Sequence, residues 1–496
     1  MLRSHWKILL VVGVITFVPL FVNLGTYPLQ IWDEARNATN SYEMYKDHDY
    51  LVPKFQGYSE LWNTKPPLLL WLQSTSMHLF GVSEFSVRLP SALSGLLIYL
   101  LIAIGLGRLG FGNMATLIAI LLLVISPGFT GFHCLRTGDY EALLVLFLLI
   151  QIFTFYFYVN TEGEAHRRFY LHILLIAVIL GVLTKGVNSL LFLPALAVMW
   201  FLKKMWLKET LWLFIIKVVF TISLCLSYYI VRESFDPGYI HWVKQNELGG
   251  RFLEVIDNNA QPWDFYLKLF PKQLGNWVYL ILPSVILGFT LGTSKQRQWV
   301  FYLVSNSVFF LVVISIAQTK TIWYNVPLIP LFAIVTAIGI EVTVRRLLRL
   351  VPRATERLEQ LTWAVLICVS FGWSYVRVVR ETITMTEEVK NHEEYYVVTN
   401  FLRDQLDNSN KHNWVFIDTE YSAHNWWYIE RLNDSGHHIE SFNKTELLES
   451  GMTVLLYEGK VEQYVKENYH YEELVTKTPM KLINILALKP RNDTHI

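Results

Sequence analysis

Long apolar runs separated by short charged breaks dominate the first 380 residues of the chain. A helix needs about 20 mostly apolar residues to cross the roughly 30 Å hydrocarbon core of a bilayer. Several runs are shorter than this, so the pattern predicts a polytopic α-helical membrane protein with about 11 to 13 transmembrane helices. The eleven candidate segments lie near residues 7–24, 89–107, 113–127, 140–159, 170–183, 187–202, 210–231, 274–292, 298–317, 323–343 and 361–379.

Positively charged residues mark every second break between these segments. Because cytoplasmic loops carry an excess of Lys and Arg, this alternation places the N-terminus in the cytoplasm. Residues 25–88, residues 232–273 and the tail from about residue 380 onward are then expected on the extracytoplasmic face. The expected cytoplasmic charges are Arg3, Lys7, Arg108, Arg167, Arg168, Lys203, Lys204, Lys208, Lys295, Arg297, Arg345, Arg346 and Arg349.

The tail at residues 380–496 has a different pattern from the membrane part at residues 1–379. Helix-like stretches alternate with short β-rich runs at residues 414–417, 453–457 and 482–486, which predicts a small soluble α/β domain. The tail has no glycine-rich phosphate-binding loop, so we expect an accessory or acceptor-presenting domain rather than a second catalytic site.

The composition agrees with a membrane protein, since 53% of the residues are hydrophobic. The 42 basic and 41 acidic residues nearly balance and form no basic arm, so no nucleic-acid partner is expected. Cys134, Cys225 and Cys368 lie far apart, without the spacing of a disulfide framework or a zinc site. The oligomeric state does not follow from the sequence.

Three short connections on the predicted outer face each carry a lone cation: Arg136, Lys185 and Lys320. Charge near the hydrocarbon boundary is costly, and on the disfavoured side of the membrane it indicates a functional site. Together these cations would suit a phosphate or pyrophosphate anchored in the outer leaflet. The alternative is that each side chain only extends to water along the membrane surface.

The first outer loop adds further candidates for chemistry. Asp33 stands where a surface helix could begin, and Arg36 follows one turn later, although Asp33 could equally be only a helix cap. Lys65 precedes two prolines, which hold it extended before an apolar helix and so aim its ammonium group. A second acid, Asp139, follows Arg136 at the start of the fourth apolar segment, where it could also be a cap.

Five short motifs resemble a known family. The chain reads WDEAR at 32–36, TKPPLLLWL at 64–72, FGVSEFSVRLPSAL at 80–93, RTGDYEALL at 136–144 and LTKG at 183–186. In this order they resemble the lipid A aminoarabinose transferase and protein O-mannosyltransferase superfamily, the membrane-embedded GT-C glycosyltransferases. The resemblance covers the first 200 residues and continues more weakly through residues 246–253, 260–266 and 319–333, whereas the tail shows no specific match.

The resemblance implies a GT-C membrane domain that transfers sugar from a polyprenyl phosphate, with inversion, to a lipid A, glycan or protein acceptor. It implies a bacterial inner membrane protein whose active site faces the periplasm. Asp33 and Asp139 would be the essential acids, with Asp33 as the base that deprotonates the acceptor. The implied contacts to the carrier phosphate are Arg36, Lys65, Lys185 and Arg251, with Tyr324 nearby and Lys320 as a weaker candidate.

The chain departs from the family pattern at three positions. Asn37 stands where relatives have tyrosine, Thr64 where many have glutamate, and Val187 where many have proline. Because that glutamate is a candidate metal ligand in relatives, the change at Thr64 leaves open whether a divalent metal takes part. The sugar donor is therefore the only small-molecule partner that the resemblance implies, together with membrane lipid and the acceptor.

Two other classes of protein also combine many spans with intramembrane charge. A transporter or flippase for polyprenyl-linked sugar would normally have broken helices and a site near the membrane midplane. Here the ionisable residues cluster at one face, which favours the enzyme. A scaffold that only presents the tail is disfavoured because both Asp33 and Asp139 are present.

Overall fold

A computed structural model describes residues 2–131, 133–255, 260–351, 355–384, 396–417, 421–457 and 459–490, without the side chains of residues 2–5, 248, 250 and 251. The chain divides into two compact units. The first unit contains Met1–Leu24 and Glu43–Thr384, and the second contains Gly25–Tyr42 and Met385–Ile496. A short piece of the first predicted outer loop therefore belongs with the C-terminal domain, and the division falls inside helix α2 (Asp33–Asp47).

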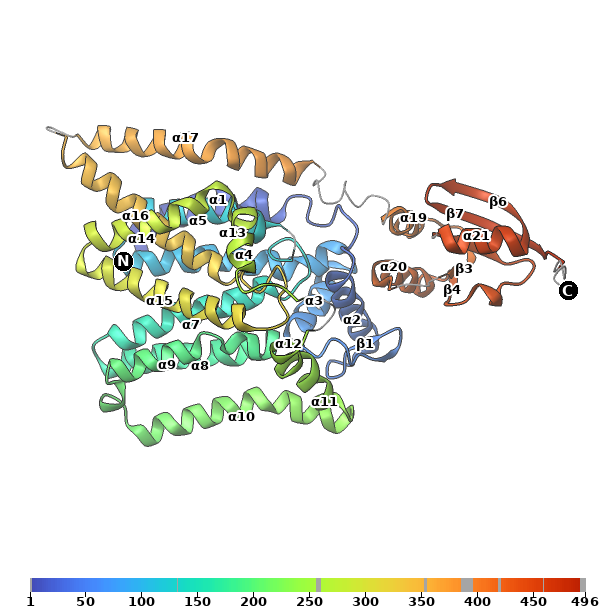
Figure 1. The fold of residues 1–496 in the computed structure, drawn as a ribbon, viewed down its shortest axis with the longest axis horizontal. Helices are drawn as coiled ribbons and strands as arrows, with labels where there is room; N and C mark the ends of the chain where they lie inside the picture. Colours follow the sequence, from blue (N-terminus) through green and yellow to red (C-terminus); the bar gives the residue numbers. More distant parts are fainter. Residues whose placement is uncertain are drawn as a thin grey trace. The chain divides into compact units, whose positions relative to one another are not determined.

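The first unit is almost entirely helical, and its long helices are seen side by side in Figure 1. Besides the later part of α2, its α-helices are α1 (Leu2–Phe21), α3 (Leu68–Phe80), α4 (Glu84–Arg108), α5 (Asn113–Val124), α6 (Pro127–Thr130), α7 (Glu141–Asn160), α8 (Glu164–Lys185), α9 (Leu193–Leu202), α10 (Leu211–Phe235), α11 (Tyr239–Val243), α12 (Gly250–Leu253), α13 (Phe265–Leu274), α14 (Ile281–Leu291), α15 (Ser294–Ile316), α16 (Leu328–Leu348) and α17 (Glu356–Ile383). The short turns η1 (Gly186–Leu190), η2 (Met205–Leu207), η3 (Lys244–Leu248) and η4 (Gly275–Leu280) connect them, and β1 (Lys54–Phe55) pairs with β2 (Tyr58–Ser59) in a small antiparallel hairpin.

The predicted spans are confirmed as helices. Among the described residues, eight helices are long and apolar enough to cross a membrane: Glu84–Arg108, Glu141–Asn160, Glu164–Leu190, Leu211–Phe235, Phe265–Leu291, Ser294–Ile316, Leu328–Leu348 and Glu356–Ile383. Three shorter apolar helices are Trp6–Phe21, Asn113–Val124 and Leu193–Leu202. These eleven correspond one to one with the predicted segments. The protein is therefore a polytopic α-helical membrane protein.

Two boundaries differ from the prediction. The segment expected at residues 187–202 begins as a short turn, η1, and becomes an α-helix only at Leu193, where Pro194 occupies the first helical turn. The second outer loop, expected at residues 232–273, contains α11, η3 and α12, and its last part is already the helix α13. The span that follows this loop therefore begins at Phe265, earlier than the apolar run near residue 274 indicated.

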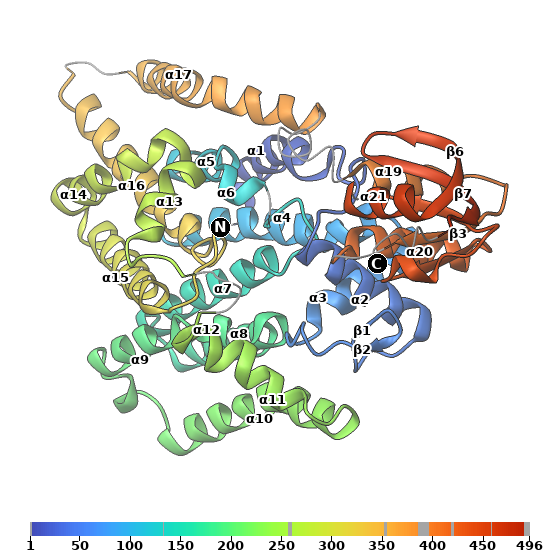
Figure 2. The same ribbon diagram turned by 45° about the vertical axis from the view of Figure 1, so that its right-hand side comes forward.

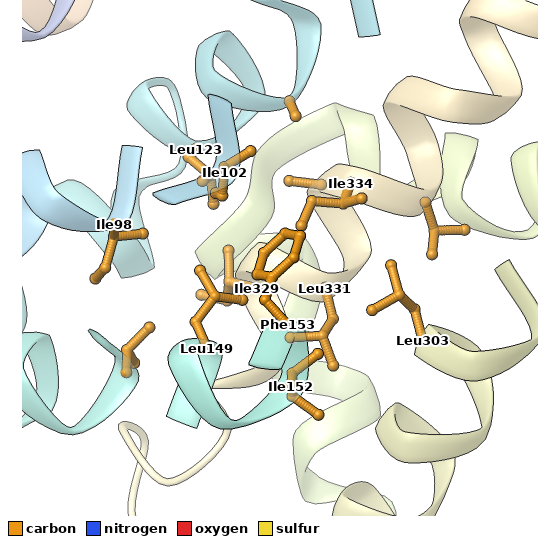
Figure 3. Packing of buried hydrophobic residues seen from close by; sticks show 14 of the residues in the cluster. Ile98, Ile102, Leu123, Leu149, Ile152, Phe153, Leu303, Ile329, Leu331 and Ile334 are labelled. Atoms are coloured by element: carbon orange, nitrogen blue, oxygen red, sulfur yellow. The ribbon is translucent and has the colours of Figure 1, made fainter. Parts of the chain in front are cut away.

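The core of the first unit lies where α4, α5, α7 and α16 meet, as Figure 3 shows around Phe153. Phe153 is 1% exposed, and a Cβ atom on Gly105 would lie 2.4 Å from its ring. Similarly, a Cβ atom on Gly339 would lie 2.4 Å from the side chain of Ser284. Small residues allow helices in a membrane to approach closely, so these two glycines bring the helices into direct contact.

The second unit contains a five-stranded mixed sheet, seen from two directions in Figures 1 and 2. The strands are β3 (Asn413–Ile417), β4 (His438–Phe442), β5 (Thr453–Leu456), β6 (Tyr469–Lys477) and β7 (Met480–Leu488), in the order β4-β3-β5-β7-β6. The helices are α19 (Val397–Gln405), α20 (Ala423–Asp434), α21 (Gly459–Asn468) and the turn η6 (Thr445–Leu447). The predicted α/β character of the tail is confirmed.

Alternation along β3 explains why helices cover both faces of this sheet. Strand β3 is parallel to β4 and to β5, whereas β7 is antiparallel to β5 and to β6. Val415 and Ile417 pack in one cluster with Val465 of α21, whereas the ring of Trp414 stacks on Phe401 of α19. Successive strand residues point to opposite faces, so apolar residues at consecutive positions of β3 fill two layers.

Candidate functional site

A buried ion pair joins the ends of two antiparallel helices. Lys185 is the last residue of α8 and Glu141 is the first residue of α7, and the Lys185 ammonium group is paired with Glu141 Oε1. Their side chains are only 6% and 4% exposed. Gly186 follows with φ of 53°, a left-handed conformation that favours glycine and ends the helix at this lysine. The Lys185 Nζ atom also lies 5.7 Å from the ring centre of Tyr324.

A second lysine lies beside a second glutamate. Lys65 Nζ is 3.9 Å from Glu247 Oε1, and the hydroxyl of Thr64 donates to the same oxygen at 3.2 Å. The Tyr239 hydroxyl donates to the carbonyl of Thr64 at 2.8 Å and fixes the backbone before the two prolines. The Lys65 ammonium also lies 5.5 Å from the ring centre of Tyr140. Glu247 therefore connects the second outer loop to the predicted Lys65 segment of the first.

Glu247 also brings the two lysines into one electrostatic cluster, because its charge acts on Lys185 as well as on Lys65. Glu247 belongs to η3, a turn of π-helix. Such turns are rare and occur often at functional sites. We call these four residues, Lys65, Lys185, Glu141 and Glu247, the lysine–glutamate cluster. It contains two positive and two negative groups, and all four side chains are largely buried.

A large apolar cavity adjoins this cluster. It has a volume of about 780 Å³ and is lined by side chains of α8, α9, α10 and α11, including Leu174, Ala197 and Leu226. Glu247 of the lysine–glutamate cluster and Gly186, which follows Lys185, also line the cavity. The volume lies within the range of about 300–1,000 Å³ that is usual for sites of small molecules. The site therefore combines a charged part with an apolar one.

Asp139 lies two residues before Glu141 and is 1% exposed. Its Oδ1 atom is 3.5 Å from Nδ1 of His133, and the ring of His133 stacks on Trp323 with centres 3.8 Å apart. Burial raises the pKa of the nearby Cys134 thiol, and the charges of Glu141 and Asp139 add to this shift. Cys134 is therefore a protonated packing residue, as its isolated position in the sequence indicated.

Asp33 and Arg36 belong to the second unit. Asp33 begins α2 and is half-buried, which confirms the predicted helix start. The backbone amide of Arg36 donates to the carbonyl of Trp32 at 3.1 Å, and Arg36 Nε donates to the Tyr421 hydroxyl at 2.9 Å. Arg36 thus has a partner from the C-terminal domain, a contact that the sequence did not predict.

The two other predicted cations hold backbone carbonyl groups. Arg136 donates to the carbonyls of Pro19 and Val22 at 2.8 and 2.9 Å, at the end of α1. Lys320 is 5% exposed and donates to the carbonyls of Ala317 and Gln261 at 2.6 and 3.0 Å. These contacts fasten two connections on the same unit. They give Lys320 a structural task whether or not it also meets a phosphate.

The predicted residues thus fall into separate groups. Lys65 and Lys185 belong to the lysine–glutamate cluster, with Tyr324 beside Lys185. Asp139 lies beside His133, and Asp33 and Arg36 belong to the second unit. The side chain of Arg251 lies outside the described residues. Within the described residues, no group of three His, Cys, Asp or Glu side chains could hold a metal ion.

Sequence reasoning missed both glutamates of the cluster. Glu141 stands inside the motif at 136–144 and Glu247 inside the weaker stretch at 246–253, but neither received a role there. A signal for Glu141 was available, since an acid that opens a long apolar helix is costly without a partner. No comparable signal marks Glu247, whose partner Lys65 is distant in the sequence.

The described part of the chain thus combines many apolar helices, a charged cluster at helix ends and a separate α/β domain. Solved structures have a similar fold. ArnT from Cupriavidus metallidurans bound to undecaprenyl phosphate has a TM-score of 0.74 at 14% identity and covers 96% of this chain and 97% of that one. The apo structure of the same protein gives a TM-score of 0.70 at 15% identity, with coverages of 97% and 98%.

Sequence comparisons show which proteins the chain resembles. The model of the family described as dolichyl-phosphate-mannose-protein mannosyltransferase matches residues 64–230. Undecaprenyl phosphate-alpha-4-amino-4-deoxy-L-arabinose arabinosyl transferases are similar to the chain. The one from Pseudomonas savastanoi pv. phaseolicola is 28% identical, with 62% of this chain and 56% of that protein covered. The one from Serratia proteamaculans is 26% identical, with coverages of 68% and 59%.

The chain spans about three fifths of the length of the relatives that it matches, 63%, 56% and 59% for three of them. The resemblance to the GT-C superfamily, and within it to the lipid A aminoarabinose and protein mannosyl transferases, is confirmed by the family model, the relatives and the fold together.

Proposed function

We propose that the protein is a glycosyltransferase that moves a sugar from a polyprenyl phosphate to an acceptor at the extracytoplasmic face of a bacterial inner membrane. The observation that carries this proposal is the lysine–glutamate cluster beside the apolar cavity of about 780 Å³. A polyprenyl phosphate has one anionic end and one long apolar chain, so it matches a site with these two parts. The names of the similar transferases support the same substrate class.

The proposed reaction needs one base and a set of cations. Asp33 accepts the proton of the acceptor hydroxyl while the acceptor oxygen attacks the anomeric carbon from the side opposite the phosphate. The bond between that carbon and the phosphate oxygen breaks, and its electron pair leaves with the polyprenyl phosphate. Asp139 orients the acceptor or supports Asp33. Because a phosphate is already a fair leaving group, no protonated acid is required on the leaving side.

The cations stabilise the negative charge that grows on the departing phosphate. Lys65 and Lys185 are the proposed principal contacts, aided by Arg36 and Arg251, and Tyr324 lies beside Lys185. Lys320, held by two carbonyl groups, remains the weakest of the proposed phosphate contacts.

The two lysines differ in how readily they can meet a phosphate. Lys65 is 3.9 Å from Glu247 and 21% exposed, whereas Lys185 is tightly paired and almost fully buried. The loose pair can reorient at low cost, so Lys65 is the proposed mobile contact. Lys185 is the proposed fixed one, with its charge held in place by Glu141 before the donor arrives.

The positive-inside distribution of charges supports an extracytoplasmic site, with the N-terminus in the cytoplasm. The acceptor is proposed by class only, as a hydroxyl-bearing lipid A, glycan or protein. A flippase for polyprenyl-linked sugar is the rival function. It would move the intact donor and would not release its phosphate carrier.

The test uses purified protein in proteoliposomes with labelled sugar on undecaprenyl phosphate, first aminoarabinose and then mannose. Transfer predicts labelled acceptor together with free polyprenyl phosphate, and Asp33→Asn or Asp139→Asn should abolish both while the protein stays folded. Movement of intact donor across the bilayer without release of its phosphate would support the flippase. Full activity in both aspartate variants would refute the assignment of the two acids.

A further inference from the structure

Residues of the C-terminal domain form hydrogen bonds with the chain both before and after Asp33. The backbone amides of Leu29 and Ile31 donate to the hydroxyls of Tyr428 and Tyr396 at 3.2 and 3.3 Å. After Asp33, the Tyr42 hydroxyl donates to Asp434 Oδ2 at 2.7 Å. Further upstream, Arg403 donates to the carbonyls of Gly25 and Thr26 at 3.0 and 2.6 Å. The segment at residues 25–42 is thus packed on the domain along most of its length.

The Tyr42 contact is electrostatically secure. Burial raises the pKa of the Tyr42 hydroxyl, and the neighbouring Asp434 carboxylate adds to the shift. The hydroxyl therefore stays protonated and keeps donating to the carboxylate. A charge-assisted hydrogen bond of this kind is shorter and stronger than a neutral one.

Tyr421 makes the contact closest to the proposed chemistry. Its hydroxyl accepts a hydrogen bond from Arg36 Nε at 2.9 Å, and the Arg36 guanidinium carbon lies 4.8 Å from its ring centre. Its ring also stacks on Trp32, with centres 5.4 Å apart and planes within 10°. Trp32 directly precedes α2 and Arg36 lies in its first turn, and both contact the same Tyr421 side chain. Tyr421 thus holds both ends of the turn that contains Asp33.

The backbone at this turn needs such support. Trp32 has φ of 75°, a left-handed conformation that bulky residues rarely adopt. Strained residues of this kind persist only where their surroundings fix them, and they are frequent at active sites. The stacked ring of Tyr421 and the held amides of Leu29 and Ile31, just before Trp32, supply that restraint within the second unit.

We propose that Tyr421 is a positioning residue for the transfer reaction, through which the C-terminal domain fixes the orientation of Asp33 and Arg36. This inference rests on the proposed function, because it assigns a role in that same reaction. It gives the C-terminal domain, expected from the sequence to be accessory, a specific role. The tail holds the turn that carries the proposed base and one of the proposed phosphate contacts.

Substitution of the hydroxyl alone gives the sharpest test. Tyr421→Phe keeps the ring that stacks on Trp32 and removes the hydroxyl that accepts from Arg36 Nε. We expect KM for the donor to rise on the order of tenfold, the usual worth of a hydrogen bond to a charged group. KM for the acceptor and the melting temperature should stay the same. Tyr421→Leu also removes the ring and should lower kcat as well, because the turn with Asp33 loses its restraint.

The matched control is Tyr464→Phe, on α21 of the same domain, where the ring packs beside Tyr469 and away from the segment at residues 25–42. It should behave like the wild type. A double-mutant cycle separates positioning from general stability. If Tyr421 acts through Arg36, Tyr421→Phe should change donor KM less than twofold in an Arg36→Gln background.

Three results would overturn the inference while leaving the proposed function intact. They are wild-type donor KM in Tyr421→Phe, an equal tenfold effect in the Arg36→Gln background, and an equal effect of Tyr464→Phe. A wild-type protein that transfers no sugar from any polyprenyl phosphate tested would overturn the proposed function, and the inference with it.

Discussion

Substitutions in the buried pair of Lys185 and Glu141 can distinguish a structural role of the Lys185 charge from a functional one. Replacing Lys185 alone by Met leaves the Glu141 carboxylate buried without its partner. Removing one member of a buried ion pair costs about 3–5 kcal/mol of stability. Both side chains are at most 6% exposed, so little of this cost is relieved by water.

This cost has a measurable size. At about 2 °C per kcal/mol, which applies to larger proteins, the melting temperature of Lys185→Met should fall by roughly 6–10 °C. Removing both charges together, in Lys185→Met/Glu141→Leu, should restore it, because hydrophobic residues of similar volume often replace a buried pair at no cost. Melting in detergent, followed by the fluorescence of a thiol-reactive dye or by aggregation, measures both changes.

Activity should not return with stability. If Lys185 holds the donor phosphate, the stable double variant still lacks that cation and should use the donor at least tenfold less efficiently than the wild type, as expected for a lost bond to a charged group. A double variant with wild-type melting temperature and wild-type donor kinetics would refute the reasoning, since Lys185 would then serve only to neutralise Glu141. The exposed pair of Arg168 and Glu164, 2.9 Å apart, gives a control in which Arg168→Met should change neither quantity.

Three further predictions follow from other parts of the first unit. Glu247→Gln removes the carboxylate that competes with the phosphate for Lys65, so inhibition by free polyprenyl phosphate should strengthen about two- to fivefold. The control Glu209→Gln, beside Arg167, should leave this inhibition unchanged. Weaker inhibition in Glu247→Gln would contradict the argument. Ala197→Phe narrows the apolar cavity and should reduce the use of donors with long polyprenyl chains more than the use of short-chain donors. The control Val369→Phe, on the exposed side of α17, should affect neither. Equal losses for both chain lengths in Ala197→Phe would count against the cavity as the binding site of the polyprenyl chain. Gly339→Ala should lower the melting temperature by roughly 2–6 °C, because the added Cβ would lie 2.5 Å from the backbone of Ser284, at a cost of about 1–3 kcal/mol. The control Gly372→Ala places its Cβ in open space and should leave the melting temperature unchanged. An unchanged melting temperature in Gly339→Ala would show that the helices can separate freely.

The membrane part of the fold could be predicted because its signal is local. Each apolar run satisfies its backbone hydrogen bonds within one helix, so length and hydropathy suffice to locate it. The start of α2 at Asp33 and the strands around residues 414–417, 453–457 and 482–486 were also visible from short patterns. Where a proline or a short turn interrupts an apolar run, as before Leu193, the boundary moved by several residues.

The partners of the predicted site residues could not be predicted. Glu247 meets Lys65 across more than 180 positions, and Tyr421 meets Arg36 across 385. Contacts at such separations depend on the packing of whole helices and domains, which no local pattern encodes. For the same reason Arg136 and Lys320, indistinguishable from Lys185 by position in the sequence, were found holding backbone carbonyls.

The assignment of residues 25–42 to the C-terminal domain is a second feature of this kind. The segment lies among the first outer loop in sequence, and its polar and aromatic residues fit a surface helix equally well. Tyrosine hydroxyls from residues 396, 421 and 428 decide where it packs. The tail, which shows no family motif, therefore carries the contacts that hold the turn with the WDEAR motif.

One measurement tests the central claim most directly. Purified protein is mixed with undecaprenyl phosphate that carries a labelled sugar and with an extract of envelope glycolipids and proteins, and mass spectrometry then follows both products. Sugar transfer predicts one free polyprenyl phosphate for each labelled acceptor, and neither product with Asp33→Asn. A donor that remains intact in the presence of the wild-type protein and every acceptor fraction would contradict the account.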